Sequence, residues 1–502
     1  MFEGLADLGW LPVVLLVVSL VVALGFEFVN GFHDTANAVA TVIYTNSLPA
    51  NRAVLISGVC NFLGVFVGGI AVAMAIVHLL PVELLVSSGT GAGLAMVMAL
   101  LISAILWNLG TWYLGLPASS SHTLIGAILG VGLANSLLPG HAFGSGVNWD
   151  KAEHVGASLL VSPIFGALVA GVLLIGMRRV IKDERLYQPP AEGEPPPGWI
   201  RWLLIGTCSG VSFAHGSNDG QKGVGLIMLI LVGVLPGGFA LNLGASRQQI
   251  QHTVAAARAL EGRVLEASIA GVDTAALAAV DAERIQHGGE EHPEGVPPHA
   301  REPKTAQAAG LMALYHLERI RSNLEGKDQV SALEPGGRWE VRESELRFEQ
   351  AWNALQAQGA VTLGEAEHAA VQADMAKLRG LTDYAPTFVL VLVALALGIG
   401  TTVGWKRIVE TVGEKIGSTH LTYAQGASAE LVAMSTVGVA AFAGLPVSTT
   451  HVLSSGVAGT MVASKSGVQS STIKKIAAAW VLTLPVVMLL AGGLYLLFRQ
   501  FV

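Results

Sequence analysis

Two kinds of polar motif each occur twice in an otherwise apolar chain, and their residue types could bind ions. An acidic motif covers residues 30–37, NGFHDTAN, and a related one covers residues 215–222, HGSNDGQK. A proline–hydroxyl motif covers residues 116–122, LPASSSH, and returns at residues 445–451 as LPVSTTH. We call these the acidic boxes and the hydroxyl boxes. Their order repeats once along the chain, which is typical of a membrane carrier with two duplicated halves. It predicts a substrate site to which both halves contribute.

The hydroxyl boxes have the composition of an oxyanion site. Pro117 and Pro446 lack an N–H and fix φ, so each is expected to end the preceding helix. A new helix starting just after them would present unpaired N–H groups and the positive end of its dipole to an anion. Six hydroxyls would add donors: Ser119, Ser120, Ser121, Ser448, Thr449 and Thr450. The alternative is that they bond to the carbonyl four residues earlier. Three consecutive hydroxyls after a proline, found twice, favour substrate binding.

The acidic boxes place carboxylates in uncharged surroundings, where an ionised group costs several kcal/mol unless it is paired, protonated or bound to a cation. Asp34 and Asp219 are therefore predicted to couple transport to a cation or proton. Asn37 lies on the same helical face as Asp34, and Lys222 follows Asp219 by three residues. Glu27, two turns before Asp34, is a second candidate proton or cation site. The alternative for Asp219 and Lys222 is an inert ion pair that holds two helices together.

Four histidines flank the boxes and are candidates for proton relay, because imidazole titrates near neutral pH: His33, His122, His215 and His451. The alternative is that each is a hydrogen-bonded structural residue. Ser121 and His122 do not form a nucleophile–base pair, since neighbouring residues on a helix point apart. An enzyme is therefore not predicted. Two cysteines, Cys60 and Cys208, are too few for a disulfide framework or a metal quartet.

The rest of the sequence indicates an all-α polytopic membrane protein. Of 502 residues, 52% are hydrophobic and 13% are charged, and long uncharged runs reach the roughly 20 residues of a membrane span. We expect a first transmembrane repeat at 8–180, a cytoplasmic linker at 181–199, the start of the second repeat at 200–244, a polar insert at 245–383 and the remainder of the second repeat at 384–500. The insert shows helical periodicity, and we expect it to be loosely packed. It lacks the basic stripe of a nucleic-acid binder.

The distribution of basic residues predicts the orientation of the chain. Arg178, Arg179, Lys182, Arg185 and Arg201 flank the linker, which should therefore face the cytoplasm. The first residues carry only acidic charge, which predicts an N-terminus outside the cell. The first half would then cross the membrane an odd number of times, so that the two repeats are inverted, both termini lie outside and the insert is cytoplasmic. Two short runs around the hydroxyl boxes are expected to form re-entrant hairpins, because broken helices are tolerated at membrane depth only around a cavity.

At these motifs the sequence resembles the inorganic phosphate transporter (PiT) family. Residues 31–38 and 216–219 resemble its Gly-x-Asn-Asp-x-x-Asn-Ala signature, and residues 117–122 and 446–451 resemble its Pro-x-Ser-x-x-His pairs. The likeness is to the bacterial low-affinity Pit-type carriers. The resemblance implies a secondary active carrier of the cell inner membrane, a homodimer without a tightly bound cofactor. It also implies that phosphate binds between the hydroxyl boxes, with cation ligands in the acidic boxes.

Two departures from the family pattern bear on the coupling ion. His33 stands where the family usually has Asn, and Lys222 stands where sodium-coupled members usually have a second Asn. A fixed ammonium would occupy or repel sodium, so proton coupling is expected. The Pit branch is associated with a transported neutral complex of phosphate with Mg²⁺, Ca²⁺ or Zn²⁺, in which Asp34 and Asp219 would be metal ligands. Sodium–phosphate symport, and a carrier or channel for another oxyanion such as sulfate, remain the alternatives.

Overall fold

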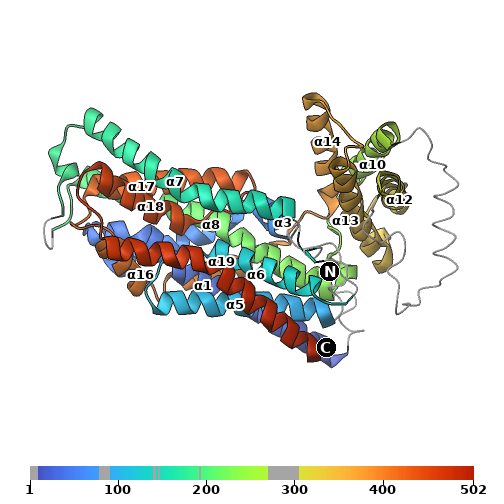
Figure 1. The fold of residues 1–502 in the computed structure, drawn as a ribbon, viewed down its shortest axis with the longest axis horizontal. Helices are drawn as coiled ribbons and strands as arrows, with labels where there is room; N and C mark the ends of the chain where they lie inside the picture. The colour runs from blue at the N-terminus through green and yellow to red at the C-terminus, as the bar shows by residue number, and fades with distance from the viewer. Residues whose placement is uncertain are drawn as a thin grey trace. The chain divides into compact units, whose positions relative to one another are not determined.

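The computed structural model describes residues 9–77, 91–139, 143, 144, 147, 149–190, 194–268 and 305–501. Regular structure in these residues is helical, apart from an isolated bridge between Gly417 and Val468 (Figure 1). The chain divides into two compact units, which we call the membrane unit (Leu11–Ile230 with Ala385–Val502) and the insert unit (Met1–Trp10 with Leu231–Tyr384). The all-α class predicted from the sequence is therefore confirmed for the described residues.

The membrane unit contains helices from both halves of the sequence. The helices before the insert are α1 (Trp10–Tyr44), α2 (Ala50–Val67), α3 (Ala71–Val77), α5 (Gly91–Tyr113), α6 (Ser120–Ser136), α7 (Trp149–Val180), η2 (Glu184–Tyr187) and α8 (Gly198–Val234). Those after it are α15 (Thr387–Thr401), α16 (Lys406–Glu410), η6 (Thr411–Lys415), α17 (Tyr423–Phe442), α18 (Thr449–Ala463), α19 (Ser470–Phe498) and η7 (Arg499–Phe501).

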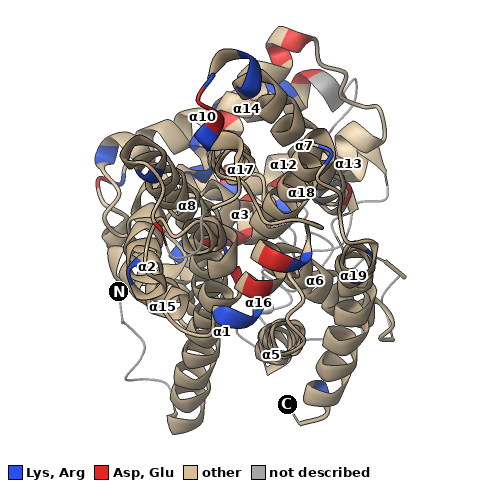
Figure 2. Ribbon diagram, turned by 90° about the vertical axis from the view of Figure 1, so that its left-hand side faces the viewer, with Lys and Arg blue, Asp and Glu red and all other residues tan. Residues whose placement is uncertain are grey.

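Several of these helices are suited to a bilayer. Among the described residues, five are long and apolar enough to span it, or six if Thr387–Thr401 and Lys406–Lys415, bent by 58°, count as one. Many large apolar side chains on them face outward, and Leu489 of α19 is 79% exposed, which suits a lipid-facing surface. Figure 2 shows that these helices carry few charged residues along their lengths. The five single helices are Trp10–Tyr44, Ala50–Val67, Gly93–Tyr113, Ala152–Val180 and Ser470–Phe501.

The two hydroxyl boxes follow identical helix ends. Gly115 after α5 and Gly444 after α17 have φ of +66° and +68°, which favours glycine because it lacks a Cβ. The next residue in each case donates its N–H to a carbonyl five residues earlier, at 2.9 Å from Leu116 to Thr111 and from Leu445 to Ala440. This is the Schellman arrangement. Each helix thus ends just before its Leu-Pro pair, and the next helix starts within the hydroxyl box.

Glycines allow two sets of helices to pack with their backbones in contact. Gly31 of α1 faces the backbone of α15, and Gly216 of α8 faces the backbone of α2, so closely that a Cβ would not fit. In the same way Gly130 of α6 faces α19, and Gly459 of α18 faces α7. Small residues at such crossings favour close helix association in a bilayer. The acidic boxes therefore lie in one set of closely packed helices, and the hydroxyl boxes lie in the other.

The insert unit contains α9 (Pro236–Phe239), α10 (Arg247–Ser268), α12 (Ala306–Leu324), η4 (Val330–Ala332), α13 (Pro335–Ala357), α14 (Glu365–Leu378) and η5 (Arg379–Leu381). Helix α12 packs against α10 and α13, and α10 packs against α14. The apolar faces predicted from periodicity are buried in their shared core, including Leu317, Ile320, Phe348 and Trp352. The expectation of loose packing was wrong, because helices far apart in the sequence complete this core. The stretch at 288–298, whose Pro and Gly residues predict a loop, lies outside the described residues.

Glu345 of α13 gives the insert unit a predictable response to pH. Burial, together with the nearby Asp383 and Glu349, raises the pKa of its carboxyl well above the ordinary value. The folded chain therefore keeps this proton at pH values where the unfolded chain has lost it. Because the unfolded state then binds fewer protons, the free energy of unfolding falls as pH rises, by up to about 1.4 kcal/mol per pH unit.

Glu345→Gln should remove that part of the pH dependence and stabilise the insert unit above neutral pH. Proteolysis of the full-length protein in increasing urea, from about pH 5, just above the ordinary pKa of Glu, to alkaline pH, would measure it. Glu318→Gln, which changes an exposed carboxylate of α12, is the control. Equal pH slopes in Glu345→Gln and the wild type would contradict the prediction.

Candidate functional site

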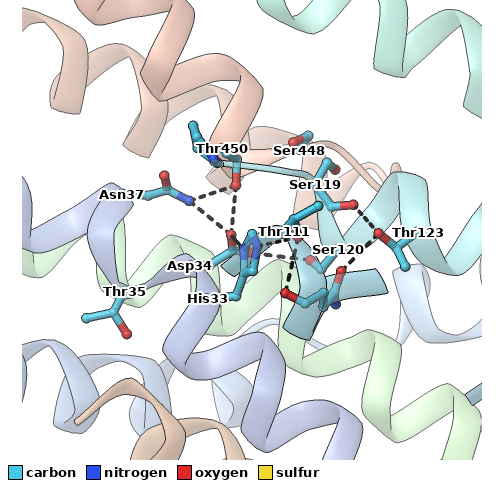
Figure 3. A network of polar contacts seen from close by, with 12 residues as sticks. His33, Asp34, Thr35, Asn37, Thr111, Ser119, Ser120, Thr123, Ser448 and Thr450 are labelled. Carbon is cyan, nitrogen blue, oxygen red and sulfur yellow. Dashed lines mark hydrogen bonds and ion pairs between the residues drawn. The ribbon is translucent and has the colours of Figure 1, made fainter. Parts of the chain in front are cut away.

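All four boxes contribute to one buried polar cluster in the membrane unit. Asp34 comes from α1, Asp219 from α8, Ser120 from the first turn of α6 and Thr450 from the first turn of α18. Each of these side chains is at most 4% exposed. Figure 3 shows the Asp34 side chain between the starts of the two hydroxyl helices, with Thr450 on one side and Ser120 on the other. Residues more than 400 positions apart in sequence are thus hydrogen-bonded to one another.

Two of the six predicted phosphate ligands have a structural role in this arrangement. Ser119 and Ser448 are N-cap residues, and their hydroxyls accept from the N–H groups of His122 at 3.2 Å and His451 at 3.1 Å. This is the usual way to satisfy a free N–H in the first turn. The caps fix where α6 and α18 begin, and so they position the next two hydroxyls of each box.

The remaining hydroxyls have three different environments. Ser120 donates to Oδ2 of Asp34 at 3.2 Å and to Oδ2 of Asp219 at 3.1 Å, which are alternative acceptors for one proton. Thr450 donates to Oδ1 of Asp34 at 2.7 Å, and Ser121 donates to the carbonyl of Val447 at 3.0 Å. Thr449 is buried, and its hydroxyl has no hydrogen-bond partner among the described residues. Thr449 is therefore the hydroxyl most available to a ligand.

The acidic boxes supply the carboxylates, an amide and an ammonium group to the cluster. The Nδ2 group of Asn37 donates to Oδ1 of Asp34 at 3.2 Å and to Oγ1 of Thr450 at 2.9 Å. Lys222 is fully buried, and its Nζ lies 2.7 Å from Oδ2 of Asp219 and 2.5 Å from Oγ of Ser121. The predicted pairing of Lys222 with Asp219 is therefore present, and the ammonium also contacts a hydroxyl box.

His215 joins the two carboxylates, a position that the sequence analysis did not assign to it. Its Nε2 lies 3.4 Å from Oδ2 of Asp34 and 3.3 Å from Oδ2 of Asp219. Its Nδ1 lies 3.0 Å from Oδ1 of Asn61 in α2. One ligand atom from each of Asp34, His215 and Asp219 lies within 4.8 Å of the other two, so the three could hold a metal ion. The four-residue spacing from His215 to Asp219 on one helix was the available sequence signal.

The other three histidines divide into two groups. His33 lies next to the cluster: its Nδ1 is 3.4 Å from Oδ1 of Asp34, and its Nε2 is 3.2 Å from Oγ1 of Thr111 in α5. His122 and His451, one from each hydroxyl box, face each other with ring centroids 4.3 Å apart. The ring of His451 also lies 4.0 Å from that of Trp480 in α19. Both imidazoles thus contact another aromatic ring.

Two glutamates of the membrane unit lie in its interior. Glu27 is fully buried in α1, accepts a hydrogen bond from Asn30 at 3.4 Å, and packs against Gly223 of α8, next to Lys222. Glu430 lies within α17, the helix before the second hydroxyl box, and accepts a hydrogen bond from Thr207 of α8. A carboxylate buried in a bilayer interior is costly unless it is paired or protonated, so both are candidates for proton uptake.

The formal charges of the cluster do not sum to zero. With both aspartates ionised and Lys222 charged, the three groups carry one net negative charge. A proton on a nearby imidazole or an entering cation would balance it, and the hydroxyls and helix N-termini beside it would accept an anion that follows. The arrangement can thus hold a cation and an oxyanion side by side.

The helices and this cluster define a polytopic membrane protein with a buried polar site built from both halves of its sequence. A match to a family model identifies the kind of membrane protein more specifically. Residues 30–491 match the model described as "Phosphate transporter family". The chain belongs to this family, whose members are transporters and not enzymes.

Individual relatives agree with the family match. The chain is 43% identical to the low-affinity inorganic phosphate transporter PitA of Escherichia coli K12, with 97% of each chain covered. It is 40% identical to PitB of the same strain, also over 97% of each, and 40% identical to a low-affinity inorganic phosphate transporter of Buchnera aphidicola, over 96% of each. A solved structure described as "The sodium-dependent phosphate transporter" has the same fold, with a TM-score of 0.51 and 20% identity over 97% of this chain and 100% of that one.

Proposed function

We propose that this chain is a secondary active transporter that imports inorganic phosphate, as a neutral divalent metal–phosphate complex, in symport with protons. One observation carries the proposal. The hydroxyl of Ser120, in the first turn of α6, lies within hydrogen-bonding distance of both Asp34 and Asp219. An anion-binding helix start is thus in direct contact with two buried carboxylates, and only a positive ion or proton between them would let an oxyanion bind there.

Phosphate is proposed to bind at the starts of α6 and α18. The first turn of each helix carries N–H groups that have no carbonyl four residues earlier to bond with. Ser120, Thr449 and Thr450 add hydroxyls, and Lys222 adds a positive charge close to Ser121. Protonated phosphate can also donate a hydrogen bond to a carboxylate, which sulfate cannot do at neutral pH. The buried aspartates therefore favour phosphate over sulfate.

The divalent metal of the transported complex is proposed to bind Asp34, His215 and Asp219. Two carboxylates and an imidazole suit several divalent ions, and the imidazole favours Zn²⁺ over Mg²⁺. The metal supplies the positive charge that the cluster lacks. Asn37 and Glu27 belong to the same cation side, and His33, His122 and His451 remain proposed proton carriers. Lys222 occupies the place of a cation at Asp219, which supports proton coupling over sodium coupling.

The two halves are proposed to be inverted repeats with re-entrant hairpins at the hydroxyl boxes. Helix α6 packs against α19 and α18 packs against α7, while α5 packs against α6 and α17 against α18. This pairing is what an exchange of equivalent helices between the halves would produce. Transport would then proceed by alternating access. We further propose that the carrier is a homodimer of the inner membrane, with both termini outside and the 245–383 insert in the cytoplasm.

Uptake of labelled phosphate into proteoliposomes tests the proposal. We expect saturable uptake that is driven by an inward proton gradient, requires a divalent metal and is independent of sodium. Radioactive zinc should enter with phosphate in the same vesicles, and sulfate should compete weakly. Strong sodium dependence would favour sodium–phosphate symport, and non-saturable flux without a gradient would favour a channel. Either result would refute the proposed mechanism.

Removing a hydroxyl from the start of α6 or α18 should weaken phosphate binding. Thr449→Ala and Ser120→Ala should each raise the KM for phosphate about tenfold, the effect of losing roughly one hydrogen bond to a charged group. The amount of protein in the membrane should not change. Ser103→Ala is the matched control, since the one partner of this buried α5 hydroxyl among the described residues is the carbonyl of Leu100, at 2.9 Å. A KM unchanged in both site variants would contradict the phosphate role.

A further inference from the structure

Helix α13 of the insert unit carries a stripe of ionisable side chains, three of them buried, although the same helix packs into an apolar core. Arg338, Arg342, Glu345 and Glu349 follow one another at steps of four, three and four residues, so they share one face. Arg338, Arg342 and Glu345 are between 3% and 7% exposed. Burying ionisable side chains is costly unless each has specific partners. The partners of this stripe therefore indicate what it is for.

The two arginines bind the chain where it enters and leaves the insert. We define the first connector as residues 235–246, between α8 and α10, and the second connector as residues 379–386, between α14 and α15. Arg338 donates to the carbonyl of Gly237 at 2.9 Å. Arg342 donates to the carbonyl of Ala240 at 3.0 Å and to that of Thr382 at 3.2 Å. One guanidinium nitrogen thus joins the first connector to the second.

Other bonds join the same two segments. The N–H of Asn242 donates to the carbonyl of Leu381 at 2.8 Å, and the hydroxyl of Tyr384 donates to the carbonyl of Phe239 at 3.1 Å. The acidic half of the stripe holds the second connector: Thr382 donates to Glu345 at 2.5 Å. Arg379 likewise donates to Glu349 at 2.9 Å. The connectors are thus bound to α13 and to each other.

These contacts are important because each connector is continuous in sequence with a long helix, α8 or α15. The first connector follows α8, which carries His215, Asp219 and Lys222, and the second connector leads directly into α15. Within the membrane unit, Thr401 of α15 accepts a hydrogen bond from Asn61 at 2.8 Å, and Asn61 in turn contacts His215. Helices α8 and α15 therefore both support the cation side of the site, one directly and one through Asn61.

We propose that the insert is a clasp that holds the ends of α8 and α15 together throughout the transport cycle, with Arg342 as its positioning residue. The clasp stays closed while the site opens to either side, so that α8 and α15 move as one body. Arg342 acts by fixing the spacing of two helix ends and does not touch the substrate. This proposal rests on the proposed phosphate transport, because uptake is its readout.

Arg342→Ala tests the clasp in the full-length protein reconstituted in vesicles. We expect the maximal rate of phosphate uptake to fall about tenfold, with little change in KM, because a doubly bonded buried guanidinium is lost while the site residues remain. Arg342→Lys, which keeps the charge but not the fixed geometry of the guanidinium, should retain part of the rate. Arg247→Ala is the control, since Arg247 is an exposed arginine of the same unit that pairs with Asp328 at 3.0 Å.

A chemical cross-link separates a clasp from a simple folding defect. Cysteines are placed at Asn242 and at Gly380, where a side chain meets no atoms within 4 Å, in a chain in which Cys60 and Cys208 are replaced. A short bis-maleimide then joins the connectors. Cross-linking should leave the uptake rate of the otherwise wild-type carrier unchanged. In the Arg342→Ala chain it should restore most of the lost rate.

Three outcomes would overturn the clasp: full activity of Arg342→Ala, inhibition of the otherwise wild-type carrier by the cross-link, or failure of the cross-link to rescue Arg342→Ala. These outcomes differ from a failure of the proposed function, in which the wild-type protein itself would show no phosphate uptake. Hydrogen exchange at the Asn242 amide gives a readout that does not depend on transport. It should speed up in Arg342→Ala and not in Arg247→Ala.

Discussion

Phosphate uptake is expected to fall by at least about a thousandfold when Asp219 is replaced by Asn, because the change removes both the cation ligand and the partner of a buried charge. Oδ2 of Asp219 lies 2.7 Å from the Lys222 ammonium, 3.1 Å from the Ser120 hydroxyl and 3.3 Å from the His215 ring. Asn has the same shape but no charge. It would leave Lys222 as an uncompensated cation in the membrane unit, and the entering cation would lose a ligand.

Asp34→Asn should have a similar effect on uptake for a partly different reason. Oδ1 of Asp34 accepts from Thr450 and Asn37, so an amide at this position would present an NH₂ group to existing donors. Uptake in proteoliposomes with matched amounts of each protein measures both effects. Asp183→Asn, which changes a partly exposed carboxylate paired with Arg185 in the linker, should transport like the wild type. Normal uptake by either Asp34→Asn or Asp219→Asn would refute the cation role of the acidic boxes.

A double substitution distinguishes coupling from an inert ion pair. In Asp219→Asn with Lys222→Met, the ammonium that lost its partner is removed as well, so the free energy of unfolding should recover relative to the Asp219→Asn single variant. If Asp219 binds the transported cation, uptake should still be absent from the double variant, even though its stability has recovered. If Asp219 and Lys222 only hold helices together, uptake should return with stability. Thermal unfolding and uptake measured on the same preparations would separate these cases.

The local features of the site could be predicted from sequence because they depend on neighbouring residues. Pro117 and Pro446 predicted helix breaks, and helices α6 and α18 begin at Ser120 and Thr449. The three-residue spacing of Asp219 and Lys222 predicted their pairing. The convergence of the boxes was an inference from duplication and from the cost of buried charge. It did not require knowledge of which helices pack together.

Features that depend on distant parts of the chain could not be predicted in this way. Ser119 and Ser448 looked equivalent to the other hydroxyls, and only the backbone direction at the helix starts makes them caps. The position of His215 depends on α1 lying beside α8. The insert was expected to be loosely packed, yet Arg342 and Glu345 are buried, and both bond to residues of the connectors. The composition gives the number of charged residues but does not show which of them have hydrogen-bond or ion-pair partners in the fold.

Lys222→Asn is expected to make phosphate uptake respond to sodium. The Lys222 ammonium already has two oxygen neighbours, Asp219 at 2.7 Å and Ser121 at 2.5 Å, and so it occupies the place of a small monovalent cation. Replacing it with Asn leaves the Asp219 carboxylate without its counter-charge and adds an amide oxygen as a ligand. Sodium should then enter, because an uncompensated carboxylate in the membrane interior is strongly disfavoured.

The measurement compares initial uptake rates in sodium and in choline. The wild type should show equal rates, and Lys222→Asn should be stimulated about tenfold by sodium, corresponding to about 1.4 kcal/mol of preferential binding. Lys222→Met is the matched control, because it removes the charge without adding an oxygen, and it should gain a much weaker response. Equal rates of Lys222→Asn in both salts would mean that a proton balances Asp219 without help from Lys222. The ammonium would then bind phosphate rather than exclude sodium. Other residues of the cluster would have to determine the coupling ion. His215 is the first candidate, since its ring lies against both carboxylates.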